Sequence, residues 1–198
     1  KLYGDIMAGI VGLTELQHTN ATSAVTINSN GTMTPAKMVY SSFTITSAQH
    51  AGTAGGYETV TNWVSLPAPH TTIGPAMTHN SGTFTFPHTG KYRITFICAG
   101  YCNGGARSYA GGQIKYSSNS GGSYSNLIRC INNGYTSSAY FQANATVLIE
   151  ITDISTQSIR FNSYASGNIV LTYNDNSTMC IFEPVSYTHL TLPTTTIV

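Results

Sequence analysis

The stretch Gly82-Thr-Phe-Thr-Phe-Pro-His-Thr-Gly-Lys-Tyr-Arg-Ile-Thr-Phe96 decides the fold. Along its second half, apolar side chains alternate with polar ones, which is typical of a strand with one buried face and one wet face. An aromatic residue ends the first half of the stretch, and a glycine permits a tight turn between the first half and the second. The residues that carry this pattern are Phe84, Gly90, Tyr92, Ile94 and Phe96. The stretch therefore predicts two strands joined by a turn, with the apolar side chains facing a core.

The same period of two recurs on both sides of this stretch. Turn-forming pairs such as Asn103-Gly104 and Gly121-Gly122 separate the runs, because glycine and asparagine tolerate positive φ. No stretch after residue 20 has helical periodicity. We predict an all-β fold, an antiparallel jelly-roll sandwich of about ten strands over residues 38–184. Strands are expected over 38–46, 58–66, 83–87, 90–99, 111–117, 125–131, 136–142, 145–152, 157–164, 168–173 and 178–184.

The central stretch also resembles the signature of the complement C-one-q globular-head family, which shares its jelly roll with tumour necrosis factor. The central motif of that family is matched by Phe84, by Gly90, and by Tyr92, Ile94 and Phe96 at alternating positions. The resemblance assigns these five residues as a fold signature.

Other segments indicate that the resemblance is to a distant branch of that family. Residues 116–122 resemble the small-residue turn that follows a middle strand in many members. Residues 150–154, in contrast, stand where relatives often have a Gly-Asp turn, and the final strand, 177–182, lacks the usual aromatic-glycine pattern.

The resemblance implies a homotrimer in which neighbours cover part of each subunit's apolar surface and loops at one end meet a ligand. A low charge agrees with this, since subunit contacts disfavour buried Lys and Glu. Viral and phage tail fibres carry such heads behind a stalk, and the chain has no collagen-like Gly-X-Y period. We therefore expect a virion or extracellular protein.

The low charge and the shortness of the apolar runs exclude nucleic-acid binding and membrane insertion. The chain has 198 residues, with 8 basic and 7 acidic side chains, a charged fraction of 8 % and a net charge of +1. Each phosphate contact needs its own cation, so we expect no nucleic-acid partner. The apolar run 6–13 contains two glycines and is far shorter than the roughly 18 residues of a membrane span, so no membrane insertion is expected.

The two ends of the chain differ from its centre. Residues 1–37 are interpreted as a connector or stalk, with a β-hairpin over 24–35 that closes at Asn30-Gly31. At the other end, Val185-Ser-Tyr-Thr-His-Leu-Thr-Leu-Pro-Thr-Thr195 resembles a translated sequencing adapter. Residues 185–198 are then a sequencing artefact with no fold, and the gene comes from an environmental shotgun assembly.

The segment 100–111 is the most suggestive of binding, because tyrosines and an arginine stand among glycines at a strand crossover. Tyrosine supplies flat, amphipathic contact area at low entropic cost. Together with tyrosines on later turns, these residues form the predicted ligand-binding rim for a cell-surface glycan or protein. They are Tyr101, Arg107, Tyr109, Tyr124 and Tyr135.

No residues have the spacing of a catalytic or metal site. The histidines are scattered, His79 and His88 are expected in solvated loops, and the carboxylates are too dispersed for a glycosidase pair. Asp175 is the only local candidate for calcium. We predict no enzyme, no cofactor and no metal. The cysteines leave buried thiols, a disulfide and a metal site open; they are Cys98, Cys102, Cys130 and Cys180.

These features favour a non-enzymatic trimeric recognition head of a viral or phage appendage. One alternative is a secreted complement-like protein-binding module, and another is a purely structural capsid or fibre decoration. A hydrolase hidden in a β-sandwich is the remaining possibility.

Overall fold

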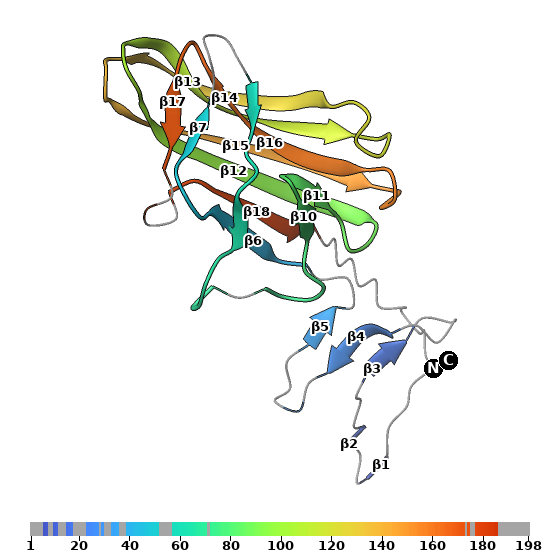
Figure 1. Ribbon diagram of the computed structural model, residues 1–198. Coiled ribbons are helices and arrows are strands. Elements are labelled where there is room, and N and C mark those ends of the chain that lie inside the picture. Colours follow the sequence, from blue (N-terminus) through green and yellow to red (C-terminus); the bar gives the residue numbers. More distant parts are fainter. Residues whose placement is uncertain are drawn as a thin grey trace, which may run out of the picture.

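The computed structural model describes residues 6–7, 10–11, 15–17, 23–27, 29, 33–35, 39–51, 57–70, 72–172, 174 and 177–185. No α-helix occurs within these residues, and every strand pair is antiparallel. Figure 1 shows two sheets stacked as layers. The predicted antiparallel sandwich is confirmed.

One layer is a six-stranded sheet in the order β10-β11-β16-β13-β14, with β8 also paired to β16. Strands distant in sequence lie side by side in it, as a jelly roll requires. Its strands are β8 (Tyr57–Thr59), β10 (Thr78–Asn80), β11 (Thr83–Thr85), β13 (Arg107–Ser117), β14 (Ser125–Tyr135) and β16 (Ser158–Ala165).

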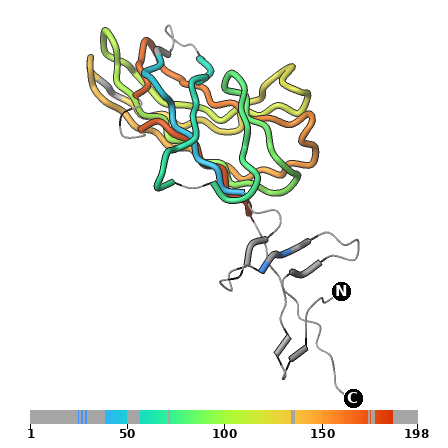
Figure 2. Tube along the Cα trace, turned by 60° about the horizontal axis from the view of Figure 1, so that its bottom comes forward, coloured from blue at the N-terminus to red at the C-terminus, as the bar shows by residue number. Residues whose placement is uncertain are grey.

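The other layer is a seven-stranded sheet in the order β7-β17-β12-β18-β6-β9, with β15 along the other side of β12. The long strands β12 to β16 run the length of the head and turn back at both ends (Figure 2). The strands of this sheet are β6 (Ser41–Ile45), β7 (Gln49–Ala51), β9 (Trp63–Ser65), β12 (Gly90–Cys102), β15 (Tyr140–Ile151), β17 (Ile169–Leu171) and β18 (Met179–Pro184).

An aromatic core fills the space between the layers. The Phe84 ring lies 5.1 Å from the rings of Phe43 and Phe182 and 5.4 Å from that of Phe161, with centroids as the reference points. Trp63 closes the cluster, and its Nε1 donates a hydrogen bond to the Val60 carbonyl at 2.8 Å. Such edge-on aromatic contacts add to the burial of apolar area that stabilises the fold.

The central stretch has the conformation expected of it. Phe84, Ile94 and Phe96 are 0 % exposed and Tyr92 is 1 % exposed, so their predicted inward side is confirmed. Gly90 begins β12 at φ +150°, outside the range that side chains favour.

Several strand boundaries differ from the expectations. The expected strands 136–142 and 145–152 are one strand, β15, because Ala143 and Ala145 continue the inward alternation between them. The expected strand 58–66 divides into β8 and β9, which belong to different sheets. Strands β7 and β10 were not expected, since polar residues dominate both.

Short strands precede the sandwich. Strands β1 (Ile6–Met7) and β2 (Ile10–Val11) pair, and β3 (Glu15–Gln17), β4 (Ser23–Ile27) and β5 (Met33–Pro35) form a small sheet. Strands β4 and β5 pair on either side of the expected Asn30-Gly31 turn, which itself lies outside the described residues. The connector interpretation of residues 1–37 stays a prediction, as does the adapter interpretation, which concerns residues that are almost all outside the described part.

Candidate functional site

Arg107, predicted to meet a ligand, is bound to backbone carbonyls of the nearby loops. Its Nη2 donates to the Asn103 carbonyl at 2.6 Å, its Nε to the Asn168 carbonyl at 3.1 Å and its Nη1 to the Ala106 carbonyl at 2.9 Å. These bonds join the turn after β12 to the turn after β16. The guanidinium therefore fixes the shape of this end of the sandwich.

The predicted rim residues do not meet in one place. The Tyr101 ring lies 5.8 Å from the Tyr140 ring on the outer face of the seven-stranded sheet, while Tyr109 lies on the outer face of the other sheet. Tyr135 pairs with Arg107 in register. Tyr124 directly precedes β14, at the opposite end of the same strand pair. The structure thus distributes Tyr101, Tyr109 and Tyr124 over both faces and both ends of the sandwich.

Tyr109 belongs to a cluster that we call the tyrosine–cation face: Tyr57, Tyr109, Tyr164, Lys115 and Arg129. The Tyr164 ring stacks on that of Tyr57 at 4.9 Å and on that of Tyr109 at 4.8 Å. The Arg129 guanidinium carbon lies 4.1 Å from the centroid of the Tyr164 ring, and the Lys115 Nζ lies 5.3 Å from that of the Tyr57 ring. Such cation–π contacts place positive charge directly against aromatic faces.

Hydrogen bonds order this face further. The Gln113 carboxamide, with its oxygen turned toward Arg129, accepts from Nε at 2.7 Å and from Nη2 at 3.0 Å. Arg129 Nη2 also donates to the Tyr57 hydroxyl at 3.3 Å. Hydrogen bonding to Tyr109 raises the pKa of Tyr164 above its usual value. Sequence reasoning missed the cluster because its residues come from four strands that only the fold brings together.

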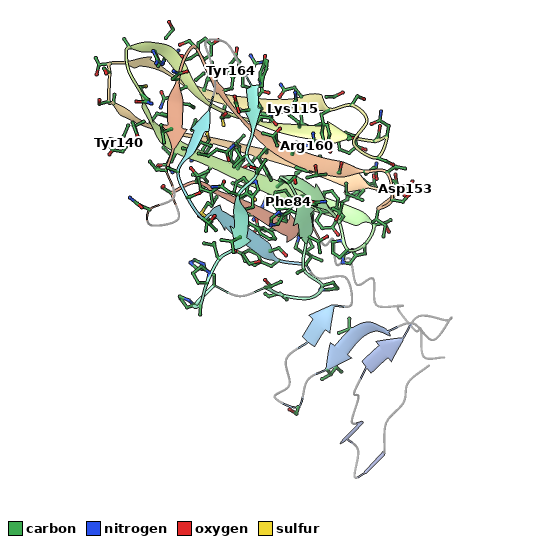
Figure 3. All side chains as sticks on the ribbon, in the orientation of Figure 1. Phe84, Lys115, Tyr140, Asp153, Arg160 and Tyr164 are labelled. Carbon is green, nitrogen blue, oxygen red and sulfur yellow. The ribbon has the colours of Figure 1, made fainter. Side chains whose placement is uncertain are left out.

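Tyr124 and Arg160 border a polar hollow of about 430 Å³ at the other end of the six-stranded sheet. The Arg160 guanidinium carbon lies 4.2 Å from the centroid of the Tyr124 ring, and its Nε donates to Thr83 Oγ1 at 2.7 Å. The Tyr124 hydroxyl lies 3.1 Å from Ser158 Oγ. Figure 3 shows Tyr164, Lys115 and Arg160 following one another along this sheet.

His79, which also lines the hollow, is not in a solvated loop as expected. It lies in β10, and its ring packs 5.2 Å from that of Phe84 and 5.6 Å from that of Phe43. Desolvation by these neighbours lowers the pKa of His79. His88 does lie in the loop before β12, as expected, but it is half-buried there, with its Nδ1 3.0 Å from the hydroxyl of the buried Tyr92.

The outer face of the seven-stranded sheet has the opposite character. We call its central part the uncharged face, formed by Thr95, Ile97, Tyr101, Tyr140, Thr146, Leu148, Met179 and Ile181. These residues are neighbours in register on β12, β15 and β18. The charged side chains of these three strands lie at one margin, where Arg93 and Glu183 form a 2.8 Å ion pair and Lys91 stands opposite Glu150.

The described residues contain no group of three or more His, Cys, Asp or Glu placed to hold a metal ion. All four cysteines are buried free thiols, and burial raises the pKa of Cys98 and Cys180 well above the usual range. Asp175 lies outside the described residues. Within the part of the chain described, no helix is long and apolar enough to cross a membrane.

The comparison with solved structures supports the fold. Neither a protein-family model nor a curated protein matches the sequence. Among solved structures, the chain is similar to Eiger TNF from S. frugiperda, with a TM-score of 0.59, 11 % identity, and coverage of 75 % of this chain and 93 % of that one. It is also similar to murine APRIL at pH 5.0, with a TM-score of 0.57, 14 % identity, and coverage of 75 % of this chain and all of that one. The sandwich therefore has a tumour necrosis factor-like jelly-roll fold.

Proposed function

We propose that this chain is a non-enzymatic recognition head that assembles as a homotrimer and binds a cell-surface glycan or protein. Residues 1–37 are its connector, and its setting is the distal part of a viral or phage appendage, on the virion or outside the cell. The fold shared with Eiger TNF and APRIL supports a head of this architecture.

The uncharged face is the observation that carries the proposal. Leu148 is 65 % exposed and Tyr140 is 76 % exposed, so large apolar side chains lie open on one side of a single subunit. Charged residues are depleted from the buried centres of interfaces, because an unpaired charge there loses its hydration. The charges on this face are confined to one margin and have partners of opposite sign. A second copy of the chain can therefore cover the face without burying an unpaired charge.

The test is a charge placed on the uncharged face. We expect Tyr140→Glu to convert a trimer into monomers, because its register partner Tyr101 is uncharged and the new carboxylate would be buried without a cation. Ile154→Glu is the matched control, since Ile154 is 43 % exposed in the turn after β15, away from this face. Sedimentation velocity measures both variants beside the unaltered chain.

Two results would contradict the proposal. One is an unaltered chain that sediments as a monomer at micromolar concentration, and the other is a Tyr140→Glu variant that stays trimeric. A stable trimer that binds neither cells nor glycans would instead support the structural decoration. Turnover of a glycan or an ester would overturn the non-enzymatic assignment.

A further inference from the structure

We propose that the outer face of the six-stranded sheet binds an acidic sugar, with its anionic group between Lys115 and Arg129 and its ring against the tyrosines of the tyrosine–cation face. The inference rests on the proposed glycan-binding function and names the class of glycan and the place where it binds.

The arrangement of the cations is the first argument. Lys115 on β13 stands directly opposite Arg160 on β16, and like charges opposite each other on a sheet destabilise it. Arg129 adds a third positive charge on β14, where it stands opposite Gln113. Three of the chain's 8 basic residues thus lie on neighbouring strands of one face. A bound anion would relieve their repulsion.

Within the described part of the sandwich, no carboxylate supplies a negative charge to this face. Glu150 and Glu183 lie on the other sheet, and Asp153 accepts its hydrogen bonds from Ser155 and Thr156 in a turn. Glu58 follows Tyr57 on β8, so it points to the opposite side of the strand. Among the described residues, Lys115 has no ion-pair or hydrogen-bond partner and contacts the Tyr57 ring.

The tyrosines supply the surface that a sugar ring needs. Tyr57 is 49 % exposed, and its ring continues the stack formed by Tyr164 and Tyr109. Tyrosine pairs an apolar ring with a hydroxyl, so it can contact the C–H face of a sugar and hydrogen-bond to its hydroxyls. Stacking already fixes these side chains, which reduces the entropy lost on binding.

The same features favour a sugar over a nucleic acid. A nucleic acid presents a row of phosphates, and its affinity depends on a matching row of cations. Here the positive charge is confined to three side chains, on a chain whose net charge is +1. A ligand with one or two carboxylate or sulfate groups fits this local charge better.

The test is a titration of the full chain with four probes by isothermal titration calorimetry. They are 3′-sialyllactose for a carboxylate, a heparin disaccharide for sulfate, neutral lactose, and a thymidine oligonucleotide. We expect at least one acidic sugar to bind more tightly than lactose and oligonucleotide, and its identity distinguishes carboxylate from sulfate. Lys115→Met should weaken that binding about tenfold, the loss of one charged contact, while Lys115→Arg retains it.

Lys91→Met is the matched control, because Lys91 is an exposed lysine on the other sheet, and it should leave affinity unchanged. Equal binding of lactose, tighter binding of the oligonucleotide, no binding of either acidic sugar, or full affinity in Lys115→Met would overturn the inference. Circular dichroism verifies that each variant is folded. If the titration fails but the unaltered chain is trimeric and binds cells, the acidic-sugar inference is wrong and the proposed function is retained. If the chain is neither trimeric nor able to bind cells, the proposed function itself is wrong.

Discussion

Only glycine fits well at position 82, because of both its backbone angle and its surroundings. Gly82 adopts φ +80°, and a Cβ there would lie 2.2 Å from the Val60 carbonyl oxygen. We expect Gly82→Ala to lower the free energy of unfolding by about 3 kcal/mol, since the clash adds to the cost of a left-handed residue. Urea denaturation followed by tryptophan fluorescence measures the change.

Gly104 separates the two effects. It adopts φ +74°, yet a Cβ there would meet no atom within 4 Å. Gly104→Ala should therefore cost only about 1 kcal/mol, the strain of the backbone alone. An equal decrease in the free energy of unfolding of Gly82→Ala and Gly104→Ala would show that the Val60 carbonyl moves aside without cost.

At the scale of elements, the turn after β15 depends on one carboxylate. Asp153 Oδ1 accepts from the Ser155 amide at 2.8 Å and from Ser155 Oγ at 2.6 Å, and Oδ2 accepts from Thr156 Oγ1 at 2.9 Å. These bonds favour the charged form and lower the pKa of Asp153 below its usual value of 3.8. The stability that this carboxylate contributes is complete above its unfolded pKa and is lost as the pH falls through the lower folded value.

Asp153→Asn tests this linkage. We expect the variant to unfold slightly more easily than the unaltered chain at pH 7, because an amide accepts these bonds more weakly than a carboxylate. Below about pH 4 the difference should shrink, since the unaltered chain then loses the same charge. Thermal unfolding across this pH range measures it, and a gap that widens toward low pH would refute the assignment.

The strands that were predictable are those whose alternation is visible locally. Tyr92, Ile94 and Phe96 carry it within β12. Strand β10 was not predictable, because Thr78-His79-Asn80 has no apolar member and is held by its pairing with β11. Arg107 was a reasonable choice for a binding rim, but its partners Asn103 and Asn168 are brought together only by the fold.

The tyrosine–cation face was hidden from sequence for the same physical reason. Tyr57 and Tyr164 are far apart along the chain, and they stack because β8 pairs with β16. Of the predicted rim, Tyr109 joins this face and Tyr124 borders the hollow at the other end of the same sheet, while Tyr101 lies on the uncharged face. A tyrosine-rich chain indicates binding surface, but only the sheet order shows which tyrosines share it.

On the scale of the whole molecule, the 8 % charged fraction is unevenly spread. One outer face gathers Lys115, Arg129 and Arg160, and the other keeps its charged side chains at one margin. This division suits a head that covers one sheet with copies of itself and leaves the other sheet open to a ligand.

Such an assembly makes stability depend on protein concentration. Association that requires the folded subunit stabilises it by mass action, so the midpoint of thermal unfolding rises as the protein is concentrated. We expect this rise for the unaltered chain and for Ile154→Glu. Tyr140→Glu should have a midpoint that does not change with concentration, because its subunits no longer associate. Differential scanning calorimetry over a hundredfold concentration range measures the dependence, and a constant midpoint for the unaltered chain would mean that the uncharged face does not join folded subunits.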